Sequence, residues 1–215
     1  MLEKFVTRAI EEFRECEKIR EEAISRSNKA RILSKQAILL THKGEIPKAG
    51  QMLNEAKLLL DEVSSLDIRF ETDGLGEIQS AWEEYAEAFI LHHLKGFSTY
   101  PSPEEMGVSF KNYLLGLGDV VGELRRSVLD SLRVGDHVKA ESEFQLMEEI
   151  YLNLVSIEEA QLFLKGLRRK IDVARSIIEN TRGELAAEIG RQRLSKHMEQ
   201  IFYNLVHRGS AGSVH

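Results

Sequence analysis

The sequence has a single cysteine, Cys16, among its 215 residues, so no disulfide bond can form within the chain. Such cysteine usage is typical of proteins from a reducing compartment. No segment approaches the roughly 20 apolar residues that span a membrane. The opening stretch MLEKFVTRAIEEFREC mixes charged and apolar side chains and does not resemble a secretory signal. We therefore expect a cytoplasmic protein that does not associate with a membrane.

Positive charge is in deficit as well. The chain carries 29 Lys and Arg against 35 Asp and Glu, which gives a formal net charge of -6. This balance does not indicate nucleic-acid binding, although a local basic surface is compatible with it. The sequence also lacks a P-loop, a dinucleotide fingerprint, an HExxH motif and zinc-type cysteine spacing. Any catalytic chemistry therefore has to come from a site without these signatures.

Proline is scarce and strand-like alternation is nearly absent, whereas helical periodicity covers most of the chain. Two of the three prolines fall in 98–107, which is the clearest predicted loop. Further breaks are expected at 41–48, 71–76 and 133–136, with helices between them. This pattern predicts an all-α fold, a bundle of about seven helices in a single domain spanning 1–215.

The last third of the chain is expected to hold two more helices. Ser156 and Glu159 have the spacing of a capping box, which would start a helix running through Ile178. Gly183 would then interrupt or bend the chain, and a final helix would run from about Glu184 to Val206. Residues 208–215 read as a flexible tail.

The segment YLLGLGDVVGELRRSVLDSL (113–132) combines an apolar stripe with an acidic face. At about 100° per residue, Asp119 and Glu123 lie one turn apart, opposite the stripe. Gly116, Gly118 and Gly122 surround this pair, although glycine disfavours helices. They would allow either a bulky substrate or a neighbouring helix to approach closely.

A second pair of carboxylates occurs in IQSAWEEYAEAFILHHL (78–94), where Glu84 and Glu87 are spaced i and i+3. Leu91 and Leu94 continue their side of the helix, so another element should cover it. If the two helices are neighbours, four carboxylates converge and could hold Mg²⁺ or Mn²⁺. The alternative is an ordinary solvated face, on which Glu123 pairs with Arg126.

Three stretches resemble the translin and translin-associated factor X family. YLLGLGDVVGELRRSVLDSLRVGD is similar to the family pattern Y-L-x-G…E-L-x-R…N-S-x-x-x-G-D, EEYAEAFILHHL to its E-Y-x-E-A helix, and YNLVHRGS to its closing Y-x-L-x-x-R-G. The matches occur in order and span most of the chain. The stretch 182–196 has no counterpart that we can place.

The resemblance implies a fold of about seven helices that assembles into a hollow oligomeric barrel, a homo-octamer, enclosing single-stranded RNA or DNA. In the factor X branch the acids form a metal-dependent endoribonuclease site. The family's two glutamates correspond to Glu84 and Glu87, its aspartate to Asp119 and the nearby glutamate to Glu123. The translin branch tends to have an apolar residue at the position of Asp119, so this chain resembles the catalytic branch.

The resemblance therefore predicts an endoribonuclease with Mg²⁺ or Mn²⁺ held by Glu84, Glu87, Asp119 and Glu123. Two alternatives remain: a non-catalytic translin-like binder of single-stranded RNA or DNA, and a helical scaffold for another protein. Arg126, and with it Arg125, is a candidate for contacting phosphate. The run RRK at 168–170 is more typical of a solvated helix face than of a nucleic-acid patch, although with Arg125 it could line a basic interior of the barrel.

Overall fold

The computed structural model describes residues 1–66, 75–157 and 163–210, and within these residues it is entirely helical. Seven helices occur in this part of the chain, which confirms the predicted all-α class. Their bounds are α1 (Leu2–His42), α2 (Ile46–Ser65), α3 (Leu75–Phe97), α4 (Pro103–Met106), α5 (Phe110–Arg133), α6 (His137–Ser156) and α8 (Leu167–Ser210). Within the same residues, no helix has the length and apolar character needed to cross a membrane.

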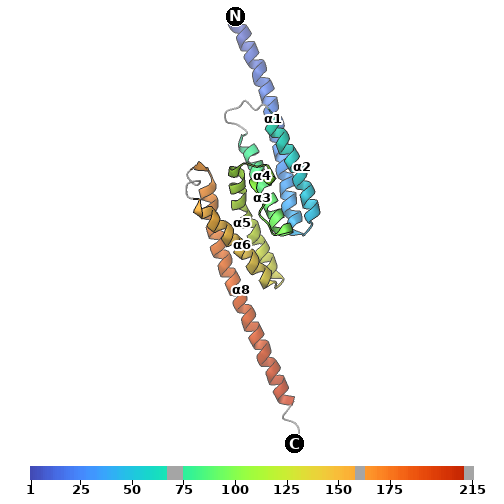
Figure 1. Cartoon of the computed structure of the whole chain (residues 1–215), viewed down its shortest axis with the longest axis vertical. Coiled ribbons are helices and arrows are strands. Elements are labelled where there is room, and N and C mark those ends of the chain that lie inside the picture. Colours follow the sequence, from blue (N-terminus) through green and yellow to red (C-terminus); the bar gives the residue numbers. More distant parts are fainter. Residues whose placement is uncertain (67–74, 158–162, 211–215) are drawn as a thin grey trace.

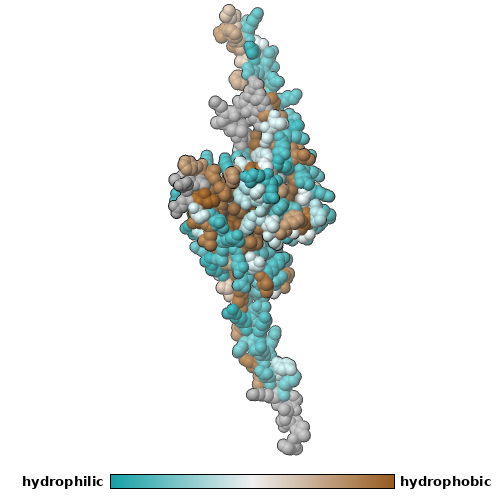
Figure 2. Space-filling model, viewed as in Figure 1, coloured by the Kyte–Doolittle hydropathy of each residue, from teal (hydrophilic) through white to brown (hydrophobic). Residues whose placement is uncertain are grey.

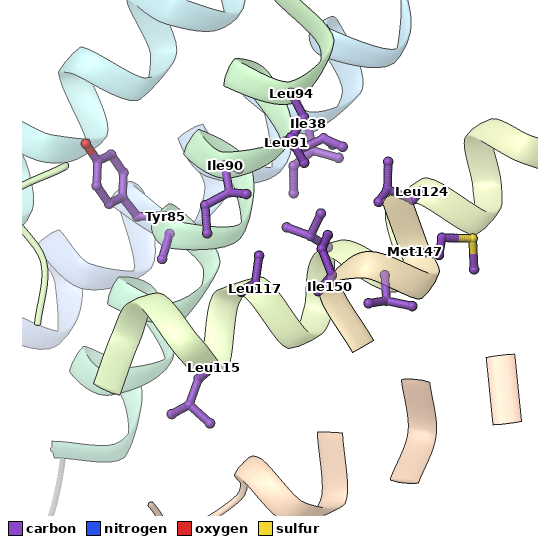
Figure 3. Close-up of a cluster of buried hydrophobic side chains, with 14 of the residues drawn as sticks. Ile38, Tyr85, Ile90, Leu91, Leu94, Leu115, Leu117, Leu124, Met147 and Ile150 are labelled. Atoms are coloured by element: carbon purple, nitrogen blue, oxygen red, sulfur yellow. The ribbon is translucent and has the colours of Figure 1, made fainter. Parts of the chain in front are cut away.

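The bundle consists of two groups of three long helices. In one group α1, α2 and α3 contact one another, and in the other α5 contacts α6 and α8, which also contact each other. The packing of α3 against α5 joins the groups (Figure 1). Figure 3 shows the core at this joint, where side chains from α3, α5 and α6 meet, among them Ile90, Leu117 and Ile150. The α3–α5 interface therefore determines how the two halves are held together.

Both terminal helices extend well beyond the bundle, in opposite directions (Figure 1). We call residues 2–22 of α1 and 186–210 of α8 the two arms. No residue of either arm is buried among those whose side chains are described. Apolar side chains nevertheless lie along both arms within a mostly hydrophilic surface (Figure 2). Exposed apolar residues of the arms include Phe5, Phe13, Leu194, Met198, Ile201 and Leu205.

The predicted break at Gly183 is wrong, because α8 is continuous from Leu167 to Ser210. A glycine inside a helix costs only about 1 kcal/mol. Buried Thr181 and Leu185, on either side of Gly183, hold the helix against the bundle and offset that cost.

The helix predicted to run from Ser156 through Ile178 is not continuous, because residues 164–166, directly before α8, are not helical. Ser156 is the last residue of α6, while Glu159 lies outside the described residues. The helix that carries Ile178 starts instead at Leu167, directly after Gly166. Gly166 has a φ of +97°, a conformation that side chains with a Cβ rarely adopt.

Two smaller differences concern a loop and the tail. The predicted loop 98–107 contains the four-residue helix α4, whose N-terminus is closed by a capping box between Ser102 and Glu105. The predicted tail 208–215 overlaps the end of α8, and residues 211–215 lie outside the described part of the chain.

Candidate active site

The four acids that the sequence singled out lie on the two helices that join the halves of the bundle. Glu84 and Glu87 belong to α3, and Asp119 and Glu123 belong to α5. The Ser109 side chain caps the start of α5 by accepting a hydrogen bond from the backbone N–H of Asn112 at 3.2 Å. This cap sets the residue at which α5 begins. The packing of α5 on α3 then places Asp119 and Glu123 relative to that helix.

Gly116 explains part of the unusual glycine content of α5. A Cβ atom at this position would lie 2.7 Å from the backbone nitrogen of Glu87 and 2.7 Å from Cβ of Ala86. Only glycine therefore lets α5 approach the backbone of α3 this closely. Of the two roles considered from the sequence, Gly116 serves helix packing, and this packing brings the two acid pairs toward each other.

The two glutamates of α3 are hard to ionise in this structure. Burial is the main cause and, with smaller contributions from nearby Asp119, Glu84 and Glu123, it raises the pKa of Glu87 to about 9. Burial also raises the pKa of Glu84, although Lys35 of α1 partly opposes this at 3.9 Å. Glu87 has no hydrogen bond or ion pair to any other described residue, so its carboxyl group lacks a cation of its own.

Asp119 is paired with a lysine from the last helix. The Nζ of Lys170 donates a hydrogen bond to Oδ2 of Asp119 and also lies 3.4 Å from Oε2 of Glu83. Burial raises the pKa of Asp119, and the Lys170 ammonium only partly offsets this effect. The aspartate is therefore held by α8 as well as by its own helix.

Glu123 is held by a histidine from the first helix. His42 Nε2 donates to Oε2 of Glu123 at 2.5 Å, and the His42 side chain is only 7% exposed. This hydrogen bond lowers the pKa of Glu123 despite partial burial. Arg126 lies 3.9 Å from the same carboxylate and is half exposed, which leaves its outer face accessible. We call Glu84, Glu87, Asp119 and Glu123 the acid cluster.

Sequence reasoning missed three of the groups that surround the acid cluster. Lys170 belongs to the RRK run, and the interpretation of this run as a solvated face is wrong for Lys170, whose side chain is only 21% exposed. His42 and Glu83 were not considered. His42 lies 81 residues from Glu123 and Lys170 lies 51 from Asp119, so no local spacing signals either contact.

Other residues that drew attention in the sequence lie apart from this chemistry. Arg125 donates to the Thr181 hydroxyl at 2.6 Å and to Glu184 at 2.9 Å, so it ties α5 to α8. Tyr85 is buried in the core, and Trp82 and Phe89 pack against it. These aromatic rings therefore serve packing.

The donor chemistry of the acid cluster suits a hard divalent cation, because its members offer carboxylate oxygens and the partly buried Glu87 forms no ion pair with any described residue. The side chains are not gathered around one point, however. Across the described ranges, no group of three or more His, Cys, Asp or Glu residues is arranged to hold a metal ion. Asp119 and Glu123 are instead turned toward Lys170 and His42. A cation that binds either acid would compete with the basic side chain already bonded to it.

Comparison with known proteins gives a consistent family assignment. A family model described as the Translin family matches residues 72–181, which include both acid pairs. An uncharacterised protein of Methanocaldococcus jannaschii is 33% identical over 128 residues, a match that covers 59% of this chain. The match spans only 57% of that relative's length.

Two kinds of solved structure share the fold. The apo form of NeC3PO superposes with a TM-score of 0.73 at 28% identity, covering 85% of this chain and 96% of that protein. AfC3PO in complex with duplex RNA gives a TM-score of 0.72 at 29% identity, covering 89% and 98%. The similarity to these structures includes both halves of the bundle and not only the matched family segment.

Proposed function

On the premise that this chain belongs to the translin family, we propose that it is a divalent-metal-dependent endoribonuclease of the factor X type, with the acid cluster as its active site. The observation that carries the proposal is the carboxyl group of Glu87, which forms no ion pair with any described residue although it lies among other acids where α3 meets α5. Burying Glu87 beside Glu84 and Asp119 raises its pKa to about 9, which destabilises the ionised form. Perturbed carboxylates of this kind are typical of functional sites.

Each member of the acid cluster has a definite part in this proposal. Glu84, Glu87 and Asp119 would hold the cation, and Glu123 would be a further ligand or would orient one through its hydrogen bond with His42. Bound Mg²⁺ or Mn²⁺ would lower the pKa of water and stabilise negative charge on the phosphate. Arg126 is half exposed beside Glu123 and is positioned to contact a phosphate oxygen.

RNA is the proposed substrate because AfC3PO, which shares the fold, has been solved with duplex RNA. We propose that the protein cleaves single-stranded RNA. Duplex RNA is therefore the second substrate against which its cleavage rate should be compared. The net charge of -6 is compatible with RNA binding if the basic side chains line an enclosed surface.

Assembly of several copies would provide such an enclosure. The two arms expose apolar side chains that no part of the described chain covers. On α8, Leu194, Met198, Ile201 and Leu205 are spaced by 4, 3 and 4 residues, a pattern typical of helices that pack on a partner helix. Apolar surface of this extent favours burial between subunits. We propose a homo-octamer, to be tested by light scattering on the full chain.

The decisive experiment replaces Asp119 with Asn and measures cleavage of labelled single-stranded and duplex RNA, with Mg²⁺ or with chelator. We expect the rate on single-stranded RNA to fall by about a hundredfold or more, with helicity and assembly unchanged. Asp130→Asn is the matched control, since Asp130 lies on the same helix, is 55% exposed and pairs only with nearby Arg133 among the described residues.

The outcomes separate the candidate functions. Equal cleavage by Asp119→Asn and the parent would remove the acid cluster from the reaction. Salt-dependent RNA binding without any cleavage by the parent would indicate the non-catalytic binder instead. That alternative is favoured by one observation, the hydrogen bonds that already engage Asp119 and Glu123 with Lys170 and His42.

A further inference from the structure

The ammonium group of Lys170 lies at the edge of the acid cluster, beside Asp119. This ammonium bonds Asp119 and lies 3.4 Å from Glu83, so Lys170 bridges α5 and α3 although it belongs to α8. Burial raises the pKa of Asp119 even with this ammonium present, so the aspartate would be still less stable as an anion without it. Lys170 therefore supplies part of the positive charge that the acid cluster needs.

The chain makes room for Lys170 through a second glycine. A Cβ atom on Gly118 would lie 3.1 Å from Cβ and 3.4 Å from Cδ of Lys170, closer than side chains usually pack. The lysine stem crosses α5 at this glycine, one residue before Asp119. Lysine has a flexible four-carbon stem, so its ammonium can exchange one anionic partner for another while the stem stays in place.

A pocket of about 420 Å³ opens beside this lysine, between α5 and α8. Lys170 and Asp119 lie in its wall together with Arg169, Gly122, Val173 and Ile177. Nothing lies within 4 Å of the position that a Cβ on Gly122 would take, so the α5 side of the pocket is open. A second cation and an exposed helix backbone are features that suit an approaching phosphate group.

A divalent ion and the Lys170 ammonium would compete for the same carboxylate oxygens of Asp119. A divalent ion bound to this carboxylate would repel the ammonium beside it, so each cation weakens binding of the other. A cation bound to the acid cluster would therefore displace the ammonium, and the pocket that Lys170 already lines is the nearest space available to it.

We propose that Lys170 is an internal cation that holds the acid cluster until a divalent ion displaces it, and that the released ammonium then binds an RNA phosphate in the adjoining pocket. The proposal rests on the function proposed above, because it takes the acid cluster to be the metal site. In this proposal, metal binding and RNA binding are coupled through one side chain. If the metal raises the affinity for RNA, then RNA raises the affinity for the metal by the same factor.

The test is calorimetric titration with MnCl₂ in the absence of RNA, on full-length parent, Lys170→Met, Lys170→Arg and Arg169→Met. We expect Lys170→Met to bind Mn²⁺ about tenfold more tightly than the parent because the competing charge is gone. Lys170→Arg keeps the charge and should resemble the parent. Arg169→Met removes the neighbouring exposed cation, which forms no ion pair with any described residue, and should leave Mn²⁺ affinity unchanged.

A second measurement follows the released ammonium. Fluorescence anisotropy with a single-stranded 2′-O-methyl RNA oligonucleotide compares affinity in chelator and in Mn²⁺. We expect Mn²⁺ to strengthen RNA binding by the parent about tenfold more than it strengthens binding by Lys170→Met. Arg169→Met should bind this RNA more weakly than the parent in both conditions. Thermal unfolding of each variant shows whether it is folded.

The outcomes distinguish failure of this inference from failure of the proposed function. If the parent binds Mn²⁺ and Lys170→Met binds it equally or more weakly, Lys170 is not a competitor and the inference is wrong, while the metal site stands. If neither binds Mn²⁺, the metal-dependent function fails together with the inference. Mn²⁺ binding by Lys170→Met alone would support the inference strongly, because the lysine would then be the barrier to metal binding.

Discussion

Two polar clusters lie along helices α3 and α5, and they differ in charge balance. The first contains Lys95 of α3 and Glu143 of α6, an ion pair whose side chains are 16% and 7% exposed. Ser127 donates to the Glu143 carboxylate at 2.9 Å and also accepts a hydrogen bond from Lys95. The second is the acid cluster, where the partly buried Glu87 forms no ion pair with any described residue and Lys170 only weakly opposes the rise in its pKa.

The difference shows what each cluster does. In the Lys95–Glu143 cluster one cation meets one carboxylate, and a hydroxyl satisfies the remaining capacity for hydrogen bonds, so the group serves as a cross-link between helices. In the acid cluster one carboxyl group, that of Glu87, forms no ion pair with any described residue, which costs stability and leaves it available to a ligand. Charge balance thus distinguishes the structural cluster from the candidate site.

The largest effect that we predict is at the balanced cluster. Replacing Glu143 with Ala leaves the Lys95 ammonium buried without its partner, and the free energy of unfolding should fall by about 3–5 kcal/mol. Glu141→Ala is the control, because Glu141 is exposed on the same helix. Urea unfolding at fixed protein concentration measures both. A loss below about 1 kcal/mol, typical of an exposed pair, would contradict the structural role of this cluster.

A smaller effect is expected where α5 comes closest to α3, beside the acid cluster. Gly116→Ala places a methyl group 2.7 Å from the backbone of Glu87 and should cost about 2 kcal/mol through forced separation of the helices. Gly122→Ala meets nothing within 4 Å and should stabilise α5 by about 0.5–1 kcal/mol. Thermal unfolding compares the two. Stabilisation by both alanines would show that close packing at Gly116 is not required.

The helices themselves could largely be predicted from the sequence, because their apolar spacing reports which face of each helix is buried. The spacing of Leu117, Val121 and Leu124 predicts the core face of α5, and all three residues are buried. The sequence overstates the effect of Gly183 on the helix. Local helix propensity ignores the packing of α8 around Leu185, which offsets the cost of the glycine.

The candidate site was predicted in part. Helical spacing identified the pairs Glu84–Glu87 and Asp119–Glu123, while their proposed joint role came from the family resemblance. The basic partners could not be found in this way. His42 and Lys170 reach the acids from α1 and α8, and such contacts depend on how whole helices pack. Lys95 and Glu143 are likewise 48 residues apart, so the balanced cluster is visible only in the folded chain.

The last predicted effect concerns Glu87 and depends on pH. Because its pKa is raised from 4.5 to about 9 on folding, the folded state binds this proton more tightly than the unfolded chain does. Its contribution to stability is therefore fully present below about pH 4.5 and is lost as the pH rises toward 9. Glu87→Gln should be close to the parent near pH 5 and exceed it by at least about 1 kcal/mol at pH 8–9.

The measurement for Glu87 is thermal unfolding across pH 5–9, with Glu77→Gln as control because Glu77 is exposed near the start of α3. About 1 kcal/mol corresponds to roughly 2–4 °C in Tm for a chain of this length. Adding Mn²⁺ should reduce the pH dependence of the parent, since a cation stabilises the ionised carboxylate, and should change Glu87→Gln less. Parallel pH profiles for the parent and Glu87→Gln would mean that this carboxyl group already has the counter-charge it needs, and the contrast with the Lys95–Glu143 cluster would then disappear.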